Sequence, residues 1–182
     1  AQNNYKNYKL IEYTVTFFML TGGINFLIHF RVIRGQIKAL WDNTEMRLWW
    51  KLIFIFTFLI ILEHLMKTGW LNNILNGQFD NAGVKIESTF RHTIFQVVSI
   101  ITTTGFGTKD IGASYFPGLA KQLFLIMMVI GGCVGSTGGG IKVLRVAALK
   151  KLLSRELFKI WAPNSASNKL IIDGEIVQDD EI

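Results

Sequence analysis

The stretch Ser99-Ile100-Ile101-Thr102-Thr103-Thr104-Gly105-Phe106-Gly107-Thr108 decides how the rest of the chain is interpreted. It completes an apolar segment, residues 88–101, and continues as a run of Thr, Gly and Phe. We predict that residues 88–101 form a helix with Ser88 as its N-cap. At about 14 residues this helix is too short to cross a bilayer, so we expect it to enter the membrane and turn back.

The tip of this re-entrant segment has the composition of a cation filter. Backbone at membrane depth is tolerated where it lines a cavity or is buried in protein. Extended backbone that contains Gly can point carbonyl oxygens at a passing ion and replace its water shell. We therefore predict an ion-binding filter at Thr103, Thr104, Gly105, Phe106 and Gly107, in which the backbone carbonyls of Thr103, Thr104 and Gly105 contact K+. The alternative is an ordinary surface turn, because short glycine loops are common.

Two further apolar segments precede the filter, at residues 13–30 and 46–66. Each is long enough to cross a hydrocarbon layer of roughly 30 Å, so we predict a transmembrane helix in each. Trp49 and Trp50 lie at the start of the second segment, where an interfacial aromatic belt is expected.

Basic residues indicate the orientation of these segments. They follow the first apolar segment at Arg31, Arg34, Lys38, Arg47 and Lys51, and the last one at Lys142, Arg145, Lys150, Lys151, Arg155 and Lys159. Both groups belong on the cytoplasmic side by the positive-inside rule, so the re-entrant helix should enter from the outer face. We interpret the net charge of +6 as a topology signal and expect no nucleic-acid binding, because the basic residues flank apolar segments.

A glycine-rich run interrupts the last apolar segment, residues 122–141, which carries no charge. Six glycines fall within residues 131–140. Each interior Gly costs a helix about 1 kcal/mol relative to Ala, so we predict that the helix breaks here, at mid-bilayer depth. The run lacks the Gly-Lys-Ser/Thr ending of a phosphate-binding loop and the spacing of a dinucleotide fingerprint. A close helix-packing motif would need fewer glycines.

We interpret this run as a flexible gate beneath the filter. Its residues are Gly131, Gly132, Gly135, Ser136, Thr137, Gly138, Gly139, Gly140 and Lys142. Lys142 would repel cations or be held by carbonyl or acidic groups; the alternative is that it extends to the cytoplasmic interface.

Residue types that are common in catalytic sites are few and scattered. A membrane-embedded hydrolase would have to use Glu63, His64, His92 and Cys133, which lack the paired spacing of a metal site. Glu63 and His64 end the second apolar segment, where interfacial placement is the simpler interpretation and a proton relay the alternative. We expect Cys133 to be a buried packing residue. The chain is therefore expected to be no enzyme and to hold no cofactor.

The chain divides into three predicted parts. Residues 1–46 contain the first predicted crossing and a cytoplasmic connector, and residues 47–160 form a helix–pore-loop–helix unit with its intramembrane loop. Residues 161–182 form a polar linker, with a small hairpin and an Asp-Gly turn at 171–177. The expected fold is an all-α membrane protein, in which one transmembrane helix precedes the helix–re-entrant pore helix–helix unit of a potassium-channel-like pore. A self-assembling two-helix cation channel subunit is the alternative, against which the first crossing and the glycine-rich run argue.

Three stretches resemble the Trk/Ktr/HKT superfamily of potassium transporters, closest to bacterial Trk-type pore subunits. They are residues 22–26 with 31–35, residues 99–106 and, most specifically, residues 131–142. The chain is most similar to the third repeat unit of such proteins, which has an intramembrane loop in its second helix. By this resemblance, Gly105 is the filter glycine associated with potassium preference, and residues 131–142 are the gate.

The resemblance also implies an assembly and a location. Four such units in one polypeptide would surround a single pore with pseudo-fourfold symmetry, so this chain would be a fragment that supplies one quarter of the filter. Residues 1–46 would then be the end of the preceding pore unit with its cytoplasmic connector, and residues 161–182 the linker toward the next unit. The implied partners are the remaining pore units, a second copy in a homodimer and a cytoplasmic nucleotide-binding regulatory subunit. The implied substrate is the potassium ion, and the implied location is multi-pass in the lipid bilayer of the cell (inner or plasma) membrane.

Overall fold

The computed structural model describes residues 7–68, 82–112, 114–161, 171–172 and 175–176, and these are helical apart from one short strand pair. The helices are α1 (Tyr8–Gly22), α2 (Phe26–Ile33), α3 (Ala39–Asp42), α4 (Thr44–Lys67), α6 (Ala82–Ile101), α7 (Gly118–Val129) and α8 (Val143–Trp161). The strands β1 (Ile171–Ile172) and β2 (Glu175–Ile176) pair antiparallel, as predicted for the hairpin. The predicted all-α fold class is confirmed.

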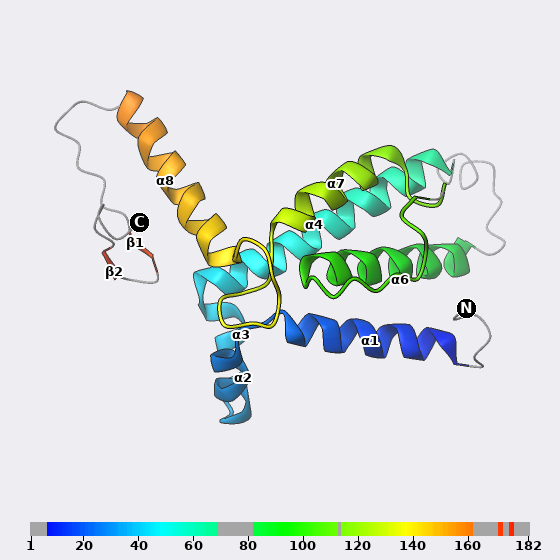
Figure 1. The fold of residues 1–182 in the computed structure, drawn as a ribbon, viewed down its shortest axis with the longest axis horizontal. Coiled ribbons are helices and arrows are strands. Elements are labelled where there is room, and N and C mark those ends of the chain that lie inside the picture. The colour runs from blue at the N-terminus through cyan, green and yellow to red at the C-terminus, as the bar shows by residue number, and fades with distance from the viewer. Residues whose placement is uncertain (1–6, 69–81, 113, 162–170, 173–174, 177–182) are drawn as a thin grey trace.

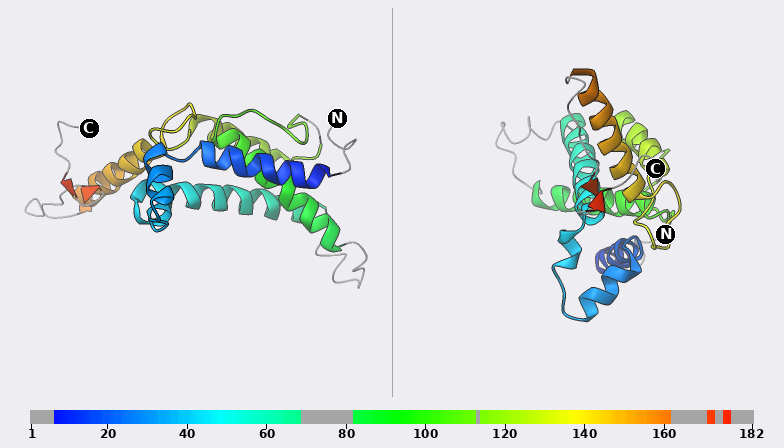
Figure 2. Two further views of the ribbon diagram at one scale, coloured as in Figure 1. Left: turned by 90° about the horizontal axis from the view of Figure 1, so that it is seen from below. Right: turned by 90° about the vertical axis from the view of Figure 1, so that its left-hand side faces the viewer.

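Four helices form a bundle, and two lead away from it (Figure 1; Figure 2). α4 contacts α6, α7 and α8, while α1 packs against α6. α2 and α8 leave the bundle at the end where α4 begins. We call residues 103–107, the predicted filter, the filter run. The filter run and the glycine-rich run therefore both lie toward this end of the bundle, where α6 and α7 end and α8 begins.

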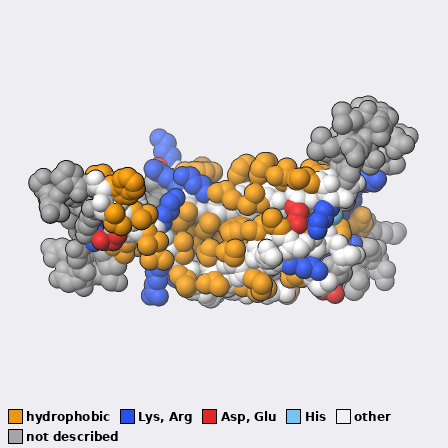
Figure 3. Space-filling model, turned by 90° about the horizontal axis from the view of Figure 1, so that it is seen from above, with side chains coloured by type: hydrophobic (Ala, Val, Ile, Leu, Met, Phe, Trp, Pro, Cys, Tyr) orange, Lys and Arg blue, Asp and Glu red, His pale blue; other side chains and the backbone are white. Residues whose placement is uncertain are grey.

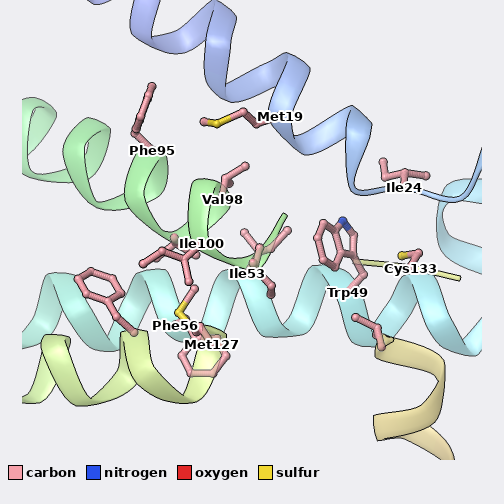
Figure 4. Packing of buried hydrophobic residues seen from close by; sticks show 14 of the residues in the cluster. Met19, Ile24, Trp49, Ile53, Phe56, Phe95, Val98, Ile100, Met127 and Cys133 are labelled. Atoms are coloured by element: carbon pink, nitrogen blue, oxygen red, sulfur yellow. The ribbon is translucent and has the colours of Figure 1, made fainter. Parts of the chain in front are cut away.

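The core is built of apolar side chains between α1, α4, α6 and α7 (Figure 4). α4 contributes Trp49, Ile53 and Phe56, which are spaced three or four residues apart and share one face. The opposite face of α4 is also apolar, with Phe54 and Phe58 exposed at 70% and 54%. A helix that is apolar all round is typical of a membrane span.

The described helices bear out the second predicted crossing. Within the described part of the chain, α4 is the one helix that is both long and apolar enough to cross a membrane alone. It contains the whole of residues 46–66. Figure 3 agrees with this interpretation, because hydrophobic side chains cover the middle of the displayed face and Lys and Arg side chains gather toward its two ends.

The prediction of one continuous crossing over residues 13–30 is wrong. The chain bends by 106° between α1 and α2. Asn25 explains the bend, since its side chain accepts a hydrogen bond of 2.8 Å from the backbone N–H of Leu27 and so caps a new helix. Two glycines, Gly22 and Gly23, come just before it and weaken the first helix. α1 thus ends at Gly22, and α2 leaves in a new direction.

The helix before the filter is longer than predicted. α6 has 20 residues and begins at Ala82, six residues before the predicted start at Ser88. Ser88 is therefore not an N-cap; its hydroxyl donates 2.9 Å to the carbonyl of Lys85 inside the helix. Residues 69–81, which precede α6, lie outside the described residues. The predicted end of the helix at residue 101 is confirmed.

The break in the last apolar segment is where the glycine-rich run predicted it. α7 ends at Val129 and α8 begins at Val143. α7 has 12 residues, so it does not cross a bilayer by itself. Pro117 precedes the first residue of α7 in extended conformation, as is typical of a residue at a helix start.

Candidate functional site

The backbone of the filter run changes the sign of φ at alternate residues. Thr103 has φ of +56° and is the one described non-glycine residue with positive φ, and Gly105 has φ of +80°. A non-glycine residue in this region costs about 1–3 kcal/mol and persists where its surroundings enforce it. In a regular strand, successive carbonyls point to opposite sides, whereas alternation of the sign of φ turns them toward one side. Residues 103–107 are all exposed in this chain.

Hydrogen bonds from α6 hold the filter run in this shape. The backbone N–H groups of Thr103 and Thr104 donate to the carbonyls of Ile100 and Ser99, each at 2.9 Å. The Ser99 hydroxyl donates 2.6 Å to the carbonyl oxygen of Phe106. Among the described residues, no donor bonds to the carbonyl oxygens of Thr103, Thr104 or Gly105. These three oxygens are therefore available to an ion, while that of Phe106 is held by the scaffold.

A buried polar face of α6 contacts the filter run, and it was not predicted from the sequence. His92, Gln96 and Ser99 are buried, with 8%, 3% and 0% of their surface exposed. The Nδ1 atom of His92 is 2.9 Å from the hydroxyl oxygen of Thr108. The polar face therefore contacts the chain on both sides of Gly107, through Ser99 at Phe106 and through His92 at Thr108. The signal was present in the sequence, because polar residues at spacings of four and three lie on one face of a helix.

The glycine-rich run forms a closed loop, which we call the intramembrane loop (residues 131–142). Its two ends pair, because the Gly131 N–H donates to the Ile141 carbonyl and the Ile141 N–H donates to the Val129 carbonyl, both at 2.9 Å. Only glycine fits at Gly131, where a Cβ atom would overlap the carbonyl oxygen of Gly139. The glycines therefore permit a close approach of two backbone segments as well as breaking the helix.

The intramembrane loop touches the filter run. The N–H of Gly139 donates 2.8 Å to the hydroxyl of Thr103, the residue with positive φ. The backbone of Gly138 also approaches the carbonyl of Thr102, since a Cβ at Gly138 would lie 3.3 Å from that oxygen. A movement of the loop would therefore act directly on Thr103, the first residue of the filter run.

The same loop is also bonded to the break between α1 and α2. The N–H of Cys133 donates 3.0 Å to the Gly23 carbonyl, and the hydroxyl of Thr137 donates 3.1 Å to the Gly22 carbonyl. The N–H of Phe26 in turn donates 3.3 Å to the carbonyl of Gly135. Figure 4 shows Cys133 near Ile24 and Trp49 at this junction. Three irregular segments that are distant in sequence therefore meet at one place.

Two charged side chains fix the intramembrane loop. Glu45, which is 6% exposed at the start of α4, accepts a hydrogen bond of 2.6 Å from the N–H of Val134. The ammonium group of Lys142 donates to the carbonyl of Gly138 within the loop. Of the alternatives for Lys142, the structure thus has it held by a loop carbonyl.

A buried ion pair joins α1 to α6. The guanidinium of Arg91 contacts the carboxylate of Glu12, and the two side chains are 3% and 2% exposed. Arg91 Nε also donates 2.9 Å to Glu87, which is 3.3 Å from the ammonium group of Lys9. This network connects α6, the helix that leads into the filter run, to α1. α1 lies in residues 1–46, the part that was predicted to end the preceding unit.

The candidate hydrolase residues do not form a catalytic group. The carboxylate of Glu63 accepts hydrogen bonds of 3.0 and 2.7 Å from the N–H groups of Leu119 and Ala120, and so caps the start of α7. His64 and His92 each contact the ring of Tyr115, with ring centroids 5.0 and 5.6 Å away. Cys133 is fully buried, as expected of a packing residue. The described residues contain no group of three His, Cys, Asp or Glu that could hold a metal ion.

Comparison with known protein families gives a match over nearly the whole chain. The family TrkH, described as cation transport protein, matches residues 3–182. The chain is 34% identical over 166 residues to the Trk system potassium uptake protein TrkH of Salmonella typhimurium, which covers 91% of this chain and 31% of that protein. The corresponding protein of Escherichia coli is 34% identical over 169 residues, with the same coverage. The chain thus spans about a third of the length of these relatives.

The fold also matches a solved structure. The crystal structure of the potassium transporter TrkH from Vibrio parahaemolyticus superposes with a TM-score of 0.78 at 28% sequence identity. The match covers 95% of this chain and 34% of that protein.

Proposed function

This chain belongs to the TrkH family of cation transport proteins, and from that premise we propose that it supplies one quarter of the selectivity filter of a potassium pore and an intramembrane gate. Its family consists of membrane transport proteins rather than enzymes. Residues 47–160 would be the helix–pore-loop–helix unit, residues 1–46 the end of the preceding unit with its connector, and residues 161–182 the linker to the next.

One observation carries the proposal. The carbonyl oxygens of Thr103, Thr104 and Gly105 accept no hydrogen bond from any described residue, in an exposed segment where the sign of φ alternates. Elsewhere, such oxygens at membrane depth would be paired, because an unsatisfied backbone group there costs several kcal/mol. A potassium ion that has shed water is a suitable partner. Phe106 and Gly107 complete the filter segment, with the Phe106 oxygen held by Ser99.

The remaining oxygens around such an ion would come from other units. Since one run provides one side of a ring of carbonyls, the ion needs the remaining pore units of the same subunit. The length of the relatives supports this, because the chain spans 31% of each. We further propose a homodimer in the bilayer of the cell (inner or plasma) membrane, with a cytoplasmic nucleotide-binding regulatory subunit. The proposed substrate is K+, with no resident cofactor in this chain.

We propose that the intramembrane loop gates the pore. The loop is bonded to Thr103, the first residue of the filter run, and combines a glycine-rich composition with fixed anchors at Glu45 and Lys142. Gly139→Ala tests this idea without a clash, because a Cβ there would come no closer than 3.8 Å to the Thr103 side chain. We expect slower potassium flux, since Ala narrows the conformations that the loop can adopt. Wild-type flux in this variant would contradict a gating role.

The transport proposal is tested by ion flux into proteoliposomes that contain the complete protein of which this chain is part. We expect potassium flux in excess of sodium flux, and loss of that preference in Gly105→Ser. Gly35→Ser is the matched control, because Gly35 has a similar φ of +85° and open space around it, as Gly105 does, but lies between α2 and α3. Flux from the 182-residue chain alone would instead favour the self-assembling channel. A complete protein that moves neither ion would refute the proposal.

A further inference from the structure

A cationic cavity lies between the first turns of α4 and the middle of α8, away from the filter run. Its volume is about 380 Å³. Four basic and two hydroxyl side chains line it: Arg47, Lys51, Lys150, Lys151, Thr44 and Ser154. None of the described residues that line it is acidic. Four positive charges together with hydroxyl donors make this cavity suited to a phosphate group.

Two indole rings lie beside Arg47, one of the basic residues that line the cavity. Trp41 stacks on Trp50, with ring centroids 6.4 Å apart, and the indole N–H of Trp50 donates 2.9 Å to the carbonyl of Leu40. Indole rings concentrate where the hydrocarbon meets the headgroups. Arg47 is tied to the same corner, because its Nε donates 2.9 Å to the Trp41 carbonyl. These rings favour an interfacial position for the start of α4, and with it headgroup depth for Arg47.

An apolar surface continues from the cavity along α4. Residues 47, 51, 54 and 58 are spaced by four, three and four, so they share one face of the helix. Beyond the basic pair Arg47 and Lys51, this face carries Phe54 and Phe58, which are stacked with centroids 6.1 Å apart and largely exposed. Along α4 this face thus changes from cationic side chains to exposed aromatic rings. A free phosphate has no apolar part that could use the second half of this face.

We propose that this cavity binds the phosphate headgroup of an anionic phospholipid of the cytoplasmic leaflet, with the acyl chains lying along Phe54 and Phe58. Basic pockets between membrane helices on the cytoplasmic side are suited to such headgroups. The lipid would bridge α4 and α8, and α8 continues directly from the intramembrane loop. An effect of the lipid on gating rests on the proposed function, whereas the binding itself does not.

Native mass spectrometry of the complete protein tests this proposal, with titrations of phosphatidylglycerol, of phosphatidylcholine and of inorganic phosphate. The test variant is Lys51→Gln with Lys150→Gln. The control is Arg31→Gln with Lys38→Gln, which removes the same charge beside a second cavity that also contains Asp42. We expect the test variant to bind phosphatidylglycerol about 30-fold more weakly, as ~1 kcal/mol per basic residue implies. The control variant and phosphatidylcholine binding should be unchanged.

A second variant, Phe54→Ser, separates a lipid from a soluble anion. It should weaken phosphatidylglycerol binding while it leaves the four cations in place. Inorganic phosphate that competes fully at millimolar concentration would replace the lipid by a soluble anion and overturn the proposal. Equal losses in the test and control variants would show a diffuse surface charge effect and no site. Unchanged lipid binding in the test variant would show that the lipid assignment is wrong. The basic residues of the cavity would then be suited to an acidic protein surface instead.

Discussion

Replacement of Arg91 by Leu should destabilise the protein by far more than the loss of an exposed charge. The variant leaves the carboxylate of Glu12, which is 2% exposed, without its cation between α1 and α6. Removal of one partner from a buried ion pair costs about 3–5 kcal/mol, because the remaining charge is neither hydrated nor paired. The variant Lys9→Ala loses an ion pair with Glu87 whose side chains are 49% and 33% exposed, so it should change stability by at most about 1 kcal/mol.

The double variant Glu12→Leu with Arg91→Leu identifies the cause. If the unpaired charge is responsible, removal of both partners should restore most of the lost stability, since no buried charge remains. Thermal unfolding is measured for the complete protein in one detergent, as the wild type, the two single variants and the double variant. The coupling free energy between the two residues is the destabilisation of the double variant minus the sum of the destabilisations of the single variants. A double variant as unstable as Arg91→Leu alone would refute the reasoning, as would an Arg91→Leu variant no less stable than Lys9→Ala.

Three shorter predictions concern the filter run, the intramembrane loop and α7. Ser99→Ala removes the hydroxyl that donates 2.6 Å to the Phe106 carbonyl oxygen. The ratio of potassium to sodium flux should fall about tenfold, as expected for the loss of a hydrogen bond of ~1–1.5 kcal/mol. Ser88→Ala, on the same helix, should leave this ratio unchanged. Gly131→Ala places a Cβ on the Gly139 carbonyl oxygen and should abolish transport, whereas Gly118→Ala, which meets nothing within 4 Å, should not; flux assays of both variants decide. Glu63→Gln removes the charge that caps α7 at 3.0 and 2.7 Å and should cost about 1 kcal/mol in thermal unfolding, so an unchanged Tm would show that the cap contributes nothing.

Local chemistry accounts for what the sequence predicted correctly. The apolar composition of residues 46–66 and the six glycines at 131–140 act within a few residues, so α4 and the break between α7 and α8 are where they were expected. The start of α6 was missed because the polar residues before Ser88 have the composition of a loop, although they are helical from Ala82 onward. Asn25 lies inside the predicted crossing at residues 13–30, whereas in the structure it caps the start of a new helix.

Contacts between distant residues could not be predicted from a single sequence. Glu45 and Val134 are 89 residues apart, and Glu63 and Leu119 are 56 apart, and nothing in their local patterns pairs them. The bond between Gly139 and Thr103 is of the same kind, because it depends on how α6 and α7 pack against α4. The polar face of α6 was different, since its spacing alone could have revealed the residues that support the filter run.

The most direct test of the central claim is a crystal structure of the complete protein grown with rubidium or thallium in place of potassium. Both ions scatter anomalously and have radii near that of potassium. The account predicts an anomalous peak on the pore axis within coordination distance of the carbonyl oxygens of Thr103, Thr104 and Gly105. Peaks elsewhere in the pore, with these three oxygens unoccupied, would contradict it.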